Sequence, residues 1–324
     1  MNEDSLTFQV TDYDYYHKEI DDENKFIIRL FGKTKDEKSV YLEIEEFEIH
    51  FYFEILNDWR KSQIYRLLDD LKEQVYPKEF KEGLKSWEIV SQYKMWGFTA
   101  GKKFNFVKLK FNNYDCFKAY SRVFTKRRYK FPYLDRSKNG IKFLLYESNI
   151  DPILRFIHTM KMSSVGWISI PLKKLRKFND DEDSSNTDIK YKTDYDNIKA
   201  IEGDEIVKLD ILSFDFECYS QEGFPQSTRE SDAIFQIGMT FSKVGEKECY
   251  RKVLLALKET DPIDGSDVII YKTERELIKG FAKYVRKYDP DIITGYNIFG
   301  FDFKYLYDRA ELLGVSGFAS RLSR

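Results

Sequence analysis

Apolar and polar residues alternate in several stretches of the first half of the chain, and this pattern predicts strands with one buried face. The predicted strands are residues 25–31, 39–55, 87–98, 104–111 and 165–170. Apolar residues recur at a helical period between Ile64 and Val75, so a helix is expected there. Further helices are predicted at residues 113–125 and 151–160. Residues 1–178 are therefore expected to form a β-rich domain.

The alternation stops in residues 179–205. Ten acidic residues face three lysines between positions 179 and 206, with Ser and Asn in the gaps and almost no apolar period. Such a segment is expected to be a linker or a surface loop between two domains. Metal binding by the acidic run 180–183 is the less common alternative for this composition.

A second domain is expected from residue 206 to residue 324. Apolar stretches predict strands at residues 206–218, 233–241, 249–257 and 291–294. Between the third and fourth strands, Thr273 and Glu276 fit a capping box that begins an amphipathic helix. A last helix carries apolar residues on one face and stops at Gly314. Three strands, a helix, a strand and a helix form the opening of a ribonuclease-H-like α/β fold.

Composition narrows the class of protein. The net charge is −2, so nucleic-acid binding requires local basic patches. Two such clusters, 126–130 and 173–177, are either phosphate contacts or ordinary solvated surface. The three cysteines form no CxxC pair, which argues against a zinc knuckle or a disulfide framework and favours a reducing, intracellular compartment. No apolar run approaches the roughly 18 residues that a membrane span requires.

Two carboxylates lie on the predicted strand around residues 211–218. Successive strand side chains point to opposite faces, so Asp215 and Glu217 share one face, and Phe214, Phe216 and Cys218 take the other. A pair of carboxylates on a buried apolar strand is costly unless a cation lies between them. Hard divalent cations take oxygen ligands, so a metal site is a candidate here.

A second candidate follows the strand at residues 291–294. Its turn carries Asn297, and Asp302 comes at the start of the last helix. Taken alone, Asn297 is a residue that tolerates positive φ in a turn, and Asp302 is a helix N-cap. Combined with the carboxylates of the first strand, they are better explained as a metal site with a substrate clamp.

At this point the chain resembles the N-terminal part of B-family DNA polymerases of the eukaryotic and large-DNA-virus type. The first exonuclease motif of that family resembles Phe214–Cys218, and the second resembles Gly295–Asp302, preceded by Asp289–Thr294. The resemblance also covers the first domain. It is carried there by Phe31–Thr34, Tyr93–Lys110, Tyr146–Ser148, Arg155–Phe156 and Gly166–Ile168.

The resemblance implies template-directed DNA replication with 3′–5′ exonucleolytic proofreading. It makes Asp215, Glu217 and Asp302 the ligands of two divalent metals, Mg²⁺ or Mn²⁺, and it makes Asn297 and Phe301 contacts of the single-stranded primer 3′ end. DNA is the implied partner, without a membrane. The implied location is the nucleus or a cytoplasmic viral replication site.

The chain departs from the family pattern after Asp302. The third exonuclease motif, with its Tyr and Asp, is not found, nor are the polymerase motifs, and the last strand and helix of the exonuclease domain are expected to be missing. Three hypotheses follow. The chain is part of a polymerase completed by a second chain, or a non-catalytic nucleic-acid-binding module, or a free-standing 3′–5′ exonuclease.

Overall fold

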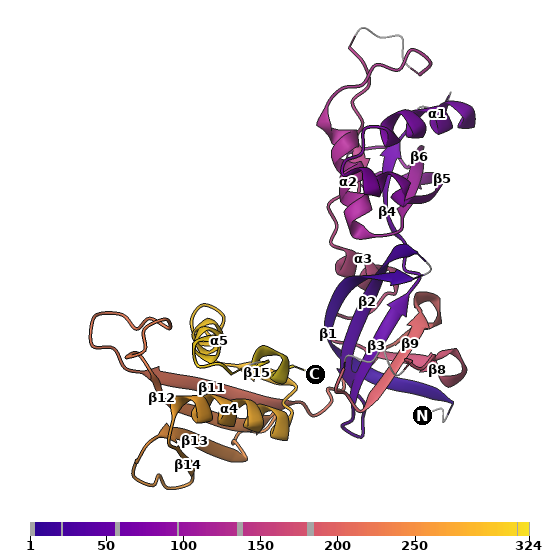
Figure 1. Ribbon diagram of the computed structural model, residues 1–324. Coiled ribbons are helices and arrows are strands. Elements are labelled where there is room, and N and C mark those ends of the chain that lie inside the picture. The colour runs from indigo at the N-terminus through magenta and orange to yellow at the C-terminus, as the bar shows by residue number, and fades with distance from the viewer. Residues whose placement is uncertain are drawn as a thin grey trace. The chain divides into compact units, whose positions relative to one another are not determined.

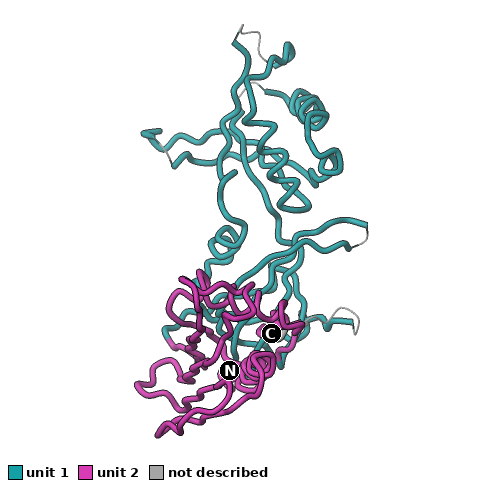
Figure 2. Tube along the Cα trace, turned by 60° about the vertical axis from the view of Figure 1, so that its left-hand side comes forward, with its two compact units in different colours: residues 1–34, 38–184, 188–204 teal, residues 35–37, 185–187, 205–324 magenta. Residues whose placement is uncertain are grey.

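The chain divides into two compact units in a computed structural model that describes residues 4–20, 22–55, 59–95, 97–134, 139–179, 185–315 and 317–323. The first unit contains residues 1–34, 38–184 and 188–204, and the second contains residues 35–37, 185–187 and 205–324 (Figure 2). Each unit has its own cluster of buried apolar side chains.

The first unit contains a six-stranded sheet in the order β10-β8-β1-β2-β3-β9 (Figure 1). Its strands are β1 (Ser5–Ile20), β2 (Glu23–Lys33), β3 (Ser39–Glu45), β8 (Trp167–Pro171), β9 (Ile189–Asp194) and β10 (Lys199–Ile201). All neighbours pair antiparallel except β3 and β9, which are parallel. The predicted β-rich character of this part of the chain is confirmed.

The same unit has a four-stranded sheet in the order β5-β6-β4-β7. Its strands are β4 (Ile49–Glu54), β5 (Leu84–Tyr93), β6 (Lys103–Phe111) and β7 (Leu145–Tyr146). Helix α1 (Lys61–Lys72) lies between β4 and β5 in the chain, α2 (Tyr114–Lys126) lies between β6 and β7, and α3 (Pro152–Thr159) follows β7. The alternation along β4 buries Ile49, Phe51 and Phe53, while the residues between them are only partly buried. Phe124 of α2 packs against Phe51 and Phe53, so α2 covers the apolar face of this sheet.

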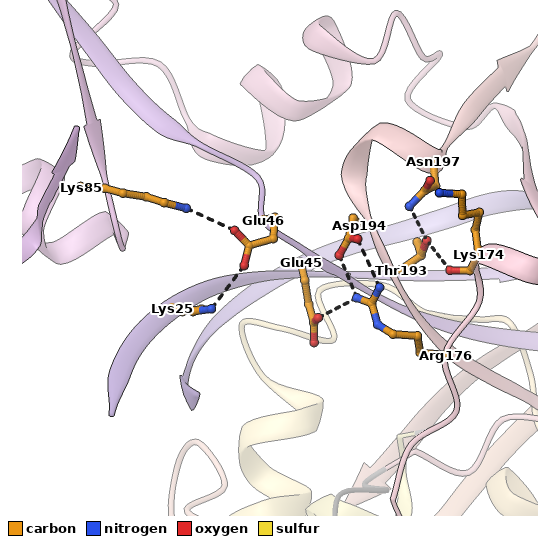
Figure 3. A network of polar contacts seen from close by, with 9 residues as sticks. All are labelled: Lys25, Glu45, Glu46, Lys85, Lys174, Arg176, Thr193, Asp194 and Asn197. Atoms are coloured by element: carbon orange, nitrogen blue, oxygen red, sulfur yellow. Dashed lines mark hydrogen bonds and ion pairs between the residues drawn. The ribbon is translucent and has the colours of Figure 1, made fainter. Parts of the chain in front are cut away.

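The prediction that residues 179–205 form a linker or a surface loop is wrong for residues 189–194 and 199–201, because β9 and β10 lie there. Arg176 helps to hold this strand in the sheet: its Nη2 donates to Glu45 Oε2 at 2.7 Å and to Asp194 Oδ1 at 2.8 Å (Figure 3). Arg176 therefore joins β3 to β9 and is a structural cation within the basic cluster 173–177. The acidic run 180–183 lies outside the described residues.

The second unit is built on a five-stranded sheet in the order β14-β13-β12-β11-β15. The strands are β11 (Asp210–Cys218), β12 (Ile234–Lys243), β13 (Arg251–Leu257), β14 (Asp267–Tyr271) and β15 (Ile292–Thr294), with α4 (Glu274–Tyr288) and α5 (Asp302–Leu312) as its helices (Figure 1). The mixed α/β fold predicted from the sequence is confirmed. Edge strand β14, which pairs parallel to β13, is an element that the sequence analysis missed.

Helix α4 begins as predicted. The Thr273 side chain accepts a hydrogen bond from the Glu276 N–H at 3.2 Å, and Glu276 accepts one from the Thr273 N–H at 3.3 Å. The helix ends at Asp289, whose left-handed backbone turns the chain toward β15. None of the described helices is both long and apolar enough to cross a membrane.

Candidate nuclease site

Strand β11 separates apolar and charged side chains onto two faces. Leu212, Phe214 and Phe216 are buried, whereas Asp215 and Glu217 are exposed. The prediction that the two carboxylates share a face is confirmed, but the prediction of a fully buried strand is wrong. Helices α4 and α5 pack on the apolar face, where Phe214 meets Phe281 and Phe303. The carboxylates remain hydrated on the other face, so they escape the desolvation cost that the sequence suggested.

Strand β15 brings the second motif beside the first. It pairs parallel to β11, with Ile211 opposite Ile292 and Ser213 opposite Thr294. The carboxyl ends of parallel strands meet at one edge of a sheet, so the turn after β15 lies next to Asp215. The turn starts at Gly295, where a Cβ atom would collide with the carbonyl oxygen of Phe214. Glycine therefore permits the close approach of the two strands.

Asn297 has the backbone role expected of a turn residue. Its φ is 55°, and its carbonyl oxygen accepts hydrogen bonds from the N–H groups of Gly300 at 2.9 Å and Phe301 at 3.0 Å. Its side-chain amide lies against Gly300, where a Cβ atom would collide with Oδ1. Asn297 is exposed at the head of α5, so its amide is accessible to a ligand. Its predicted contact with a DNA 3′ end stays a prediction.

Asp302 is the first residue of α5 and is only 3% exposed. Phe301 occupies the N-cap position, so Asp302 is not the helix N-cap that the alternative explanation required. Burial raises the pKa of the Asp302 carboxyl, the neighbouring charge of Asp215 raises that pKa further, and the hydrogen bond to its own backbone N–H partly opposes both. The structure thus brings Asp215 and Asp302 together, although 87 positions separate them in the sequence.

Glu217 lies two residues after Asp215, on the same face of β11, and is exposed. Within the residues that the structure describes, no three His, Cys, Asp or Glu side chains are arranged to hold a metal ion. The side chains therefore fit a divalent cation in part. Asp215 lies near enough to Asp302 for its charge to raise the pKa of the Asp302 carboxyl, whereas the predicted set of three ligands, with Glu217, stays a prediction.

Phe301 is partly buried among other aromatic rings. Its ring stacks on Phe216 with centroids 5.6 Å apart and contacts Tyr305 at 5.3 Å. Three aromatic side chains around the same helix start are far more exposed: Phe224 at 74%, Phe299 at 85% and Tyr296 at 92%. The sequence analysis missed these three. Large aromatic residues within polar turns were the signal that could have identified them.

A hollow of about 500 Å³ adjoins Asp215 on the open face of the sheet. Its walls come from β11, β12 and β13, from the loop before β14 and from the turn after β15. They include Gly238, Thr240, Lys252, Ile263 and Tyr296. Gly238 lies directly opposite Asp215 on β12, and the space where its side chain would be is free. The strand pairing therefore leaves room beside the carboxylate for a bound group.

A family model of the exonuclease domain of DNA polymerase family B matches residues 143–323, which is more than half of the chain. The chain belongs to DNA polymerase family B. The family match begins within the first unit and so includes β8, β9 and β10 as well as the whole five-stranded sheet of the second unit. The resemblance noted from the sequence is confirmed.

Relatives of the chain are viral and eukaryotic polymerases. It is 34% identical over 314 residues to a DNA polymerase of Acanthamoeba polyphaga mimivirus, a match that covers 93% of the chain and 18% of that protein. It is 28% identical over 341 residues to the DNA polymerase delta catalytic subunit of Caenorhabditis elegans, covering 96% of the chain and 30% of that protein. The chain thus spans less than a third of the length of these two relatives.

A solved structure agrees with the fold of this family B chain. The family B DNA polymerase of the archaeon Pyrobaculum calidifontis matches with a TM-score of 0.64 at 20% identity, over 95% of the chain and 33% of the archaeal chain. At this identity the likeness concerns the fold alone.

A buried ion pair holds the helices that position the site. Arg309 of α5 is 1% exposed, and its Nε donates to Glu274 Oε1 of α4 at 2.8 Å, with a second contact from Nη2 to Oε2. The Nη1 of Arg309 donates to the carbonyl oxygens of Ser227 at 3.2 Å and Arg229 at 2.6 Å. This network, which the sequence analysis missed, fastens α5, and with it Asp302, to α4 and to the loop after β11.

Proposed function

We propose that the chain carries the 3′–5′ proofreading exonuclease of a DNA polymerase, with residues 206–324 as the exonuclease domain and residues 1–178 as the polymerase N-terminal domain. The parent protein would replicate DNA in the nucleus or at a cytoplasmic viral replication site. The observation that carries this proposal is the parallel pairing of β11 with β15, because it brings Asp215 beside Asp302. Two carboxylates at one sheet edge suit hydrolysis of a phosphodiester with a cation as cofactor.

Asp215, Asp302 and Glu217 would be the ligands of Mg²⁺ or Mn²⁺, since hard cations prefer carboxylate oxygens. Such ions supply an activated water and neutralise the charge that develops on the phosphate and on the leaving 3′ oxygen. The protein supplies position. Burial holds the Asp302 carboxyl in one place, and β11 holds Asp215 on a strand that is paired on both sides.

The single-stranded 3′ end would lie between the hollow and the start of α5. Asn297 would contact the strand through its exposed amide, and Phe301 would do so through the edge of its aromatic cluster. The exposed rings of Tyr296, Phe299 and Phe224 extend this surface. Aromatic faces stack on any base without reading its identity, which suits an editing site that has to accept every mismatch.

A second candidate function is binding of a nucleic-acid 3′ end without hydrolysis. It is supported by the finding that no three-ligand group occurs in the described parts of the chain. A site with one carboxylate pair would still accept a cation-bridged phosphate, but it would lack a ligand that holds the ions rigidly.

The two candidates differ in one assay. The chain is incubated with a 5′-labelled single-stranded oligonucleotide and Mn²⁺, and shortening from the 3′ end is measured together with mononucleotide release. Exonuclease function predicts stepwise shortening that Asp215→Asn abolishes, while Glu222→Gln, at an exposed carboxylate in the loop after β11, leaves it unchanged. Binding to the oligonucleotide without shortening at any Mn²⁺ concentration would favour the second candidate.

A further inference from the structure

The outer face of α4 is basic in a way that the nuclease site does not use. From Lys279 to the end of the helix, every exposed position is a cation: Lys279, Lys283, Arg286 and Lys287. The inner face carries Leu277, Ile278, Phe281 and Val285, all buried in the apolar cluster of the second unit. The helix is thus fixed to its sheet on one side and presents four positive charges on the other.

These cations are not held in ion pairs by the residues that the structure describes. Among the described residues, none of the four side chains forms an ion pair, in contrast to Lys304 of α5, whose Nζ lies 2.7 Å from Asp308 Oδ2. The helix macrodipole favours positive charge in a last turn, which accounts for Arg286 and Lys287. It does not account for Lys283 and Lys279, which lie about one and two turns before Lys287. Four uncompensated charges repel one another, so this surface suits an anionic ligand.

The shape and chemistry of the face point to phosphates. Lys279, Ala282, Lys283, Arg286 and Lys287 line a shallow hollow of about 510 Å³. A protein partner would need exposed aromatic or aliphatic anchors, and the exposed positions along this stretch of α4 contain none. Lys279, Lys283 and Lys287 follow one another at steps of about 6 Å along the helix axis, because each residue rises about 1.5 Å. A row of cations of this kind follows a chain of phosphates.

We propose that the basic face of α4 binds the sugar–phosphate backbone of a nucleic acid, independently of base sequence. The site is separate from the carboxylates, because α4 packs on the apolar face of the sheet and Asp215 lies on the opposite face. It does not depend on hydrolysis, and it would hold a strand during the transfer of a 3′ end into or out of the nuclease site.

The test compares two triple variants of the whole chain that lose the same charge. Lys279→Gln, Lys283→Gln and Lys287→Gln together remove the row. The matched control is Lys208→Gln, Lys247→Gln and Lys272→Gln, at exposed and scattered positions of the same unit. Affinity for a labelled single strand and for a duplex is measured by fluorescence anisotropy over a salt series, with EDTA present so that no metal-dependent step contributes. Thermal melts check that both variants are folded.

The expected result concerns the slope of log affinity against log salt concentration. Loss of three phosphate contacts lowers its magnitude by about 2 for a single strand or about 2.7 for a duplex. The ligand whose salt slope changes, single strand or duplex, is the form of nucleic acid that the face binds. Equal slopes for wild type, row variant and control on both ligands would overturn the proposal. Failure of the hydrolysis assay would not bear on this result.

Discussion

The two faces of the five-stranded sheet differ in what their side chains do. On the covered face, the aromatic rings of β11 pack against α4 and α5, and the buried pair of Arg309 and Glu274 joins the two helices. On the open face, Asp215 and Glu217 are hydrated beside a hollow. One alternating strand thus packs apolar side chains on one face and leaves carboxylates accessible on the other. Substitutions on the two faces should therefore affect different measurements.

The largest effect is expected on the covered face. Arg309→Ala leaves Glu274 charged and buried without its partner, and it leaves two backbone carbonyls without a donor. We expect a loss of about 3–5 kcal/mol in the free energy of unfolding, measured by urea denaturation. The double variant Arg309→Met with Glu274→Met removes both charges and should regain most of that loss. A double variant as unstable as Arg309→Ala would show that the pairing of charges is not the cause.

On the open face, Asp215→Asn should abolish function and spare the fold. The carboxylate is exposed, and its replacement by an amide of the same shape is expected to change the free energy of unfolding by less than about 0.5 kcal/mol. Under the proposed function, loss of this proposed ligand should lower the rate of 3′-end hydrolysis by roughly a hundredfold or more. Rate and urea midpoint are measured on the same preparation. A destabilised variant with unchanged rate would reverse the roles assigned to the two faces.

A smaller effect on hydrolysis is expected from filling the hollow. Gly238→Val places a side chain opposite Asp215, in a strand position where β-branched residues are favourable. Stability should not fall, while the rate of 3′-end hydrolysis should drop by about tenfold, because the terminal nucleotide is displaced. Ser242→Val, four residues further along the same face of β12, is the control. A normal rate in Gly238→Val would mean that the substrate does not enter this hollow.

Asp302 is buried at the start of α5, and its effect on stability has the opposite sign from the usual one for a carboxylate. Burial and Asp215 raise its pKa in the folded chain, so the folded state binds more protons than the unfolded state above pH 4. Stability is then lost as the pH rises through that raised pKa. Asp302→Asn removes the cost and should raise the unfolding free energy at pH 7, seen as a higher melting temperature.

Asp308 of the same helix is the control, because its replacement should change the stability in the opposite direction to Asp302→Asn. Lys304 and Ser227 donate to its carboxylate, and the hydrogen bond from Lys304 is the main reason why its pKa is lowered. Its ionised form therefore stabilises the fold above the usual carboxyl pKa, so Asp308→Asn should lower the melting temperature at pH 7. Shifts in the same direction for both variants would contradict the electrostatic explanation.

Local patterns predicted the parts of the fold that depend on neighbouring residues. The alternation of β11, the capping box at Thr273 and the turn at Asn297 are all encoded within a few positions, and each was found where expected. The exposure of Asp215 was not predictable, because it depends on which distant helices cover which face. The roles of Glu217, Asn297 and Phe301 at a metal or a DNA end remain predictions.

Long-range pairing accounts for what the pattern could not give. The segment that contains β9 has the composition of an acidic linker. It forms a strand because it pairs with β3 and because Arg176 binds Glu45 and Asp194. Arg309 and Glu274 look like ordinary surface charges of two helices, since nothing local indicates that each is buried by the other. In both cases the partner lies tens of residues away, so single-sequence periodicity contains no signal for it.

Two long-range contacts of the second unit determine when β11 can be fastened during synthesis on the ribosome. The hydrogen bond from Arg309 to the Ser227 carbonyl spans 82 residues, and the Asp210 N–H reaches Asp291 across 81. At synthesis rates of about 5–20 residues per second, β11 emerges roughly 4–16 s before the segments that fasten it. During that interval the edge of β11 that later pairs with β15 is open to wrong partners. Nascent chains arrested before residue 291 should therefore recruit chaperones that chains arrested well after residue 309 do not.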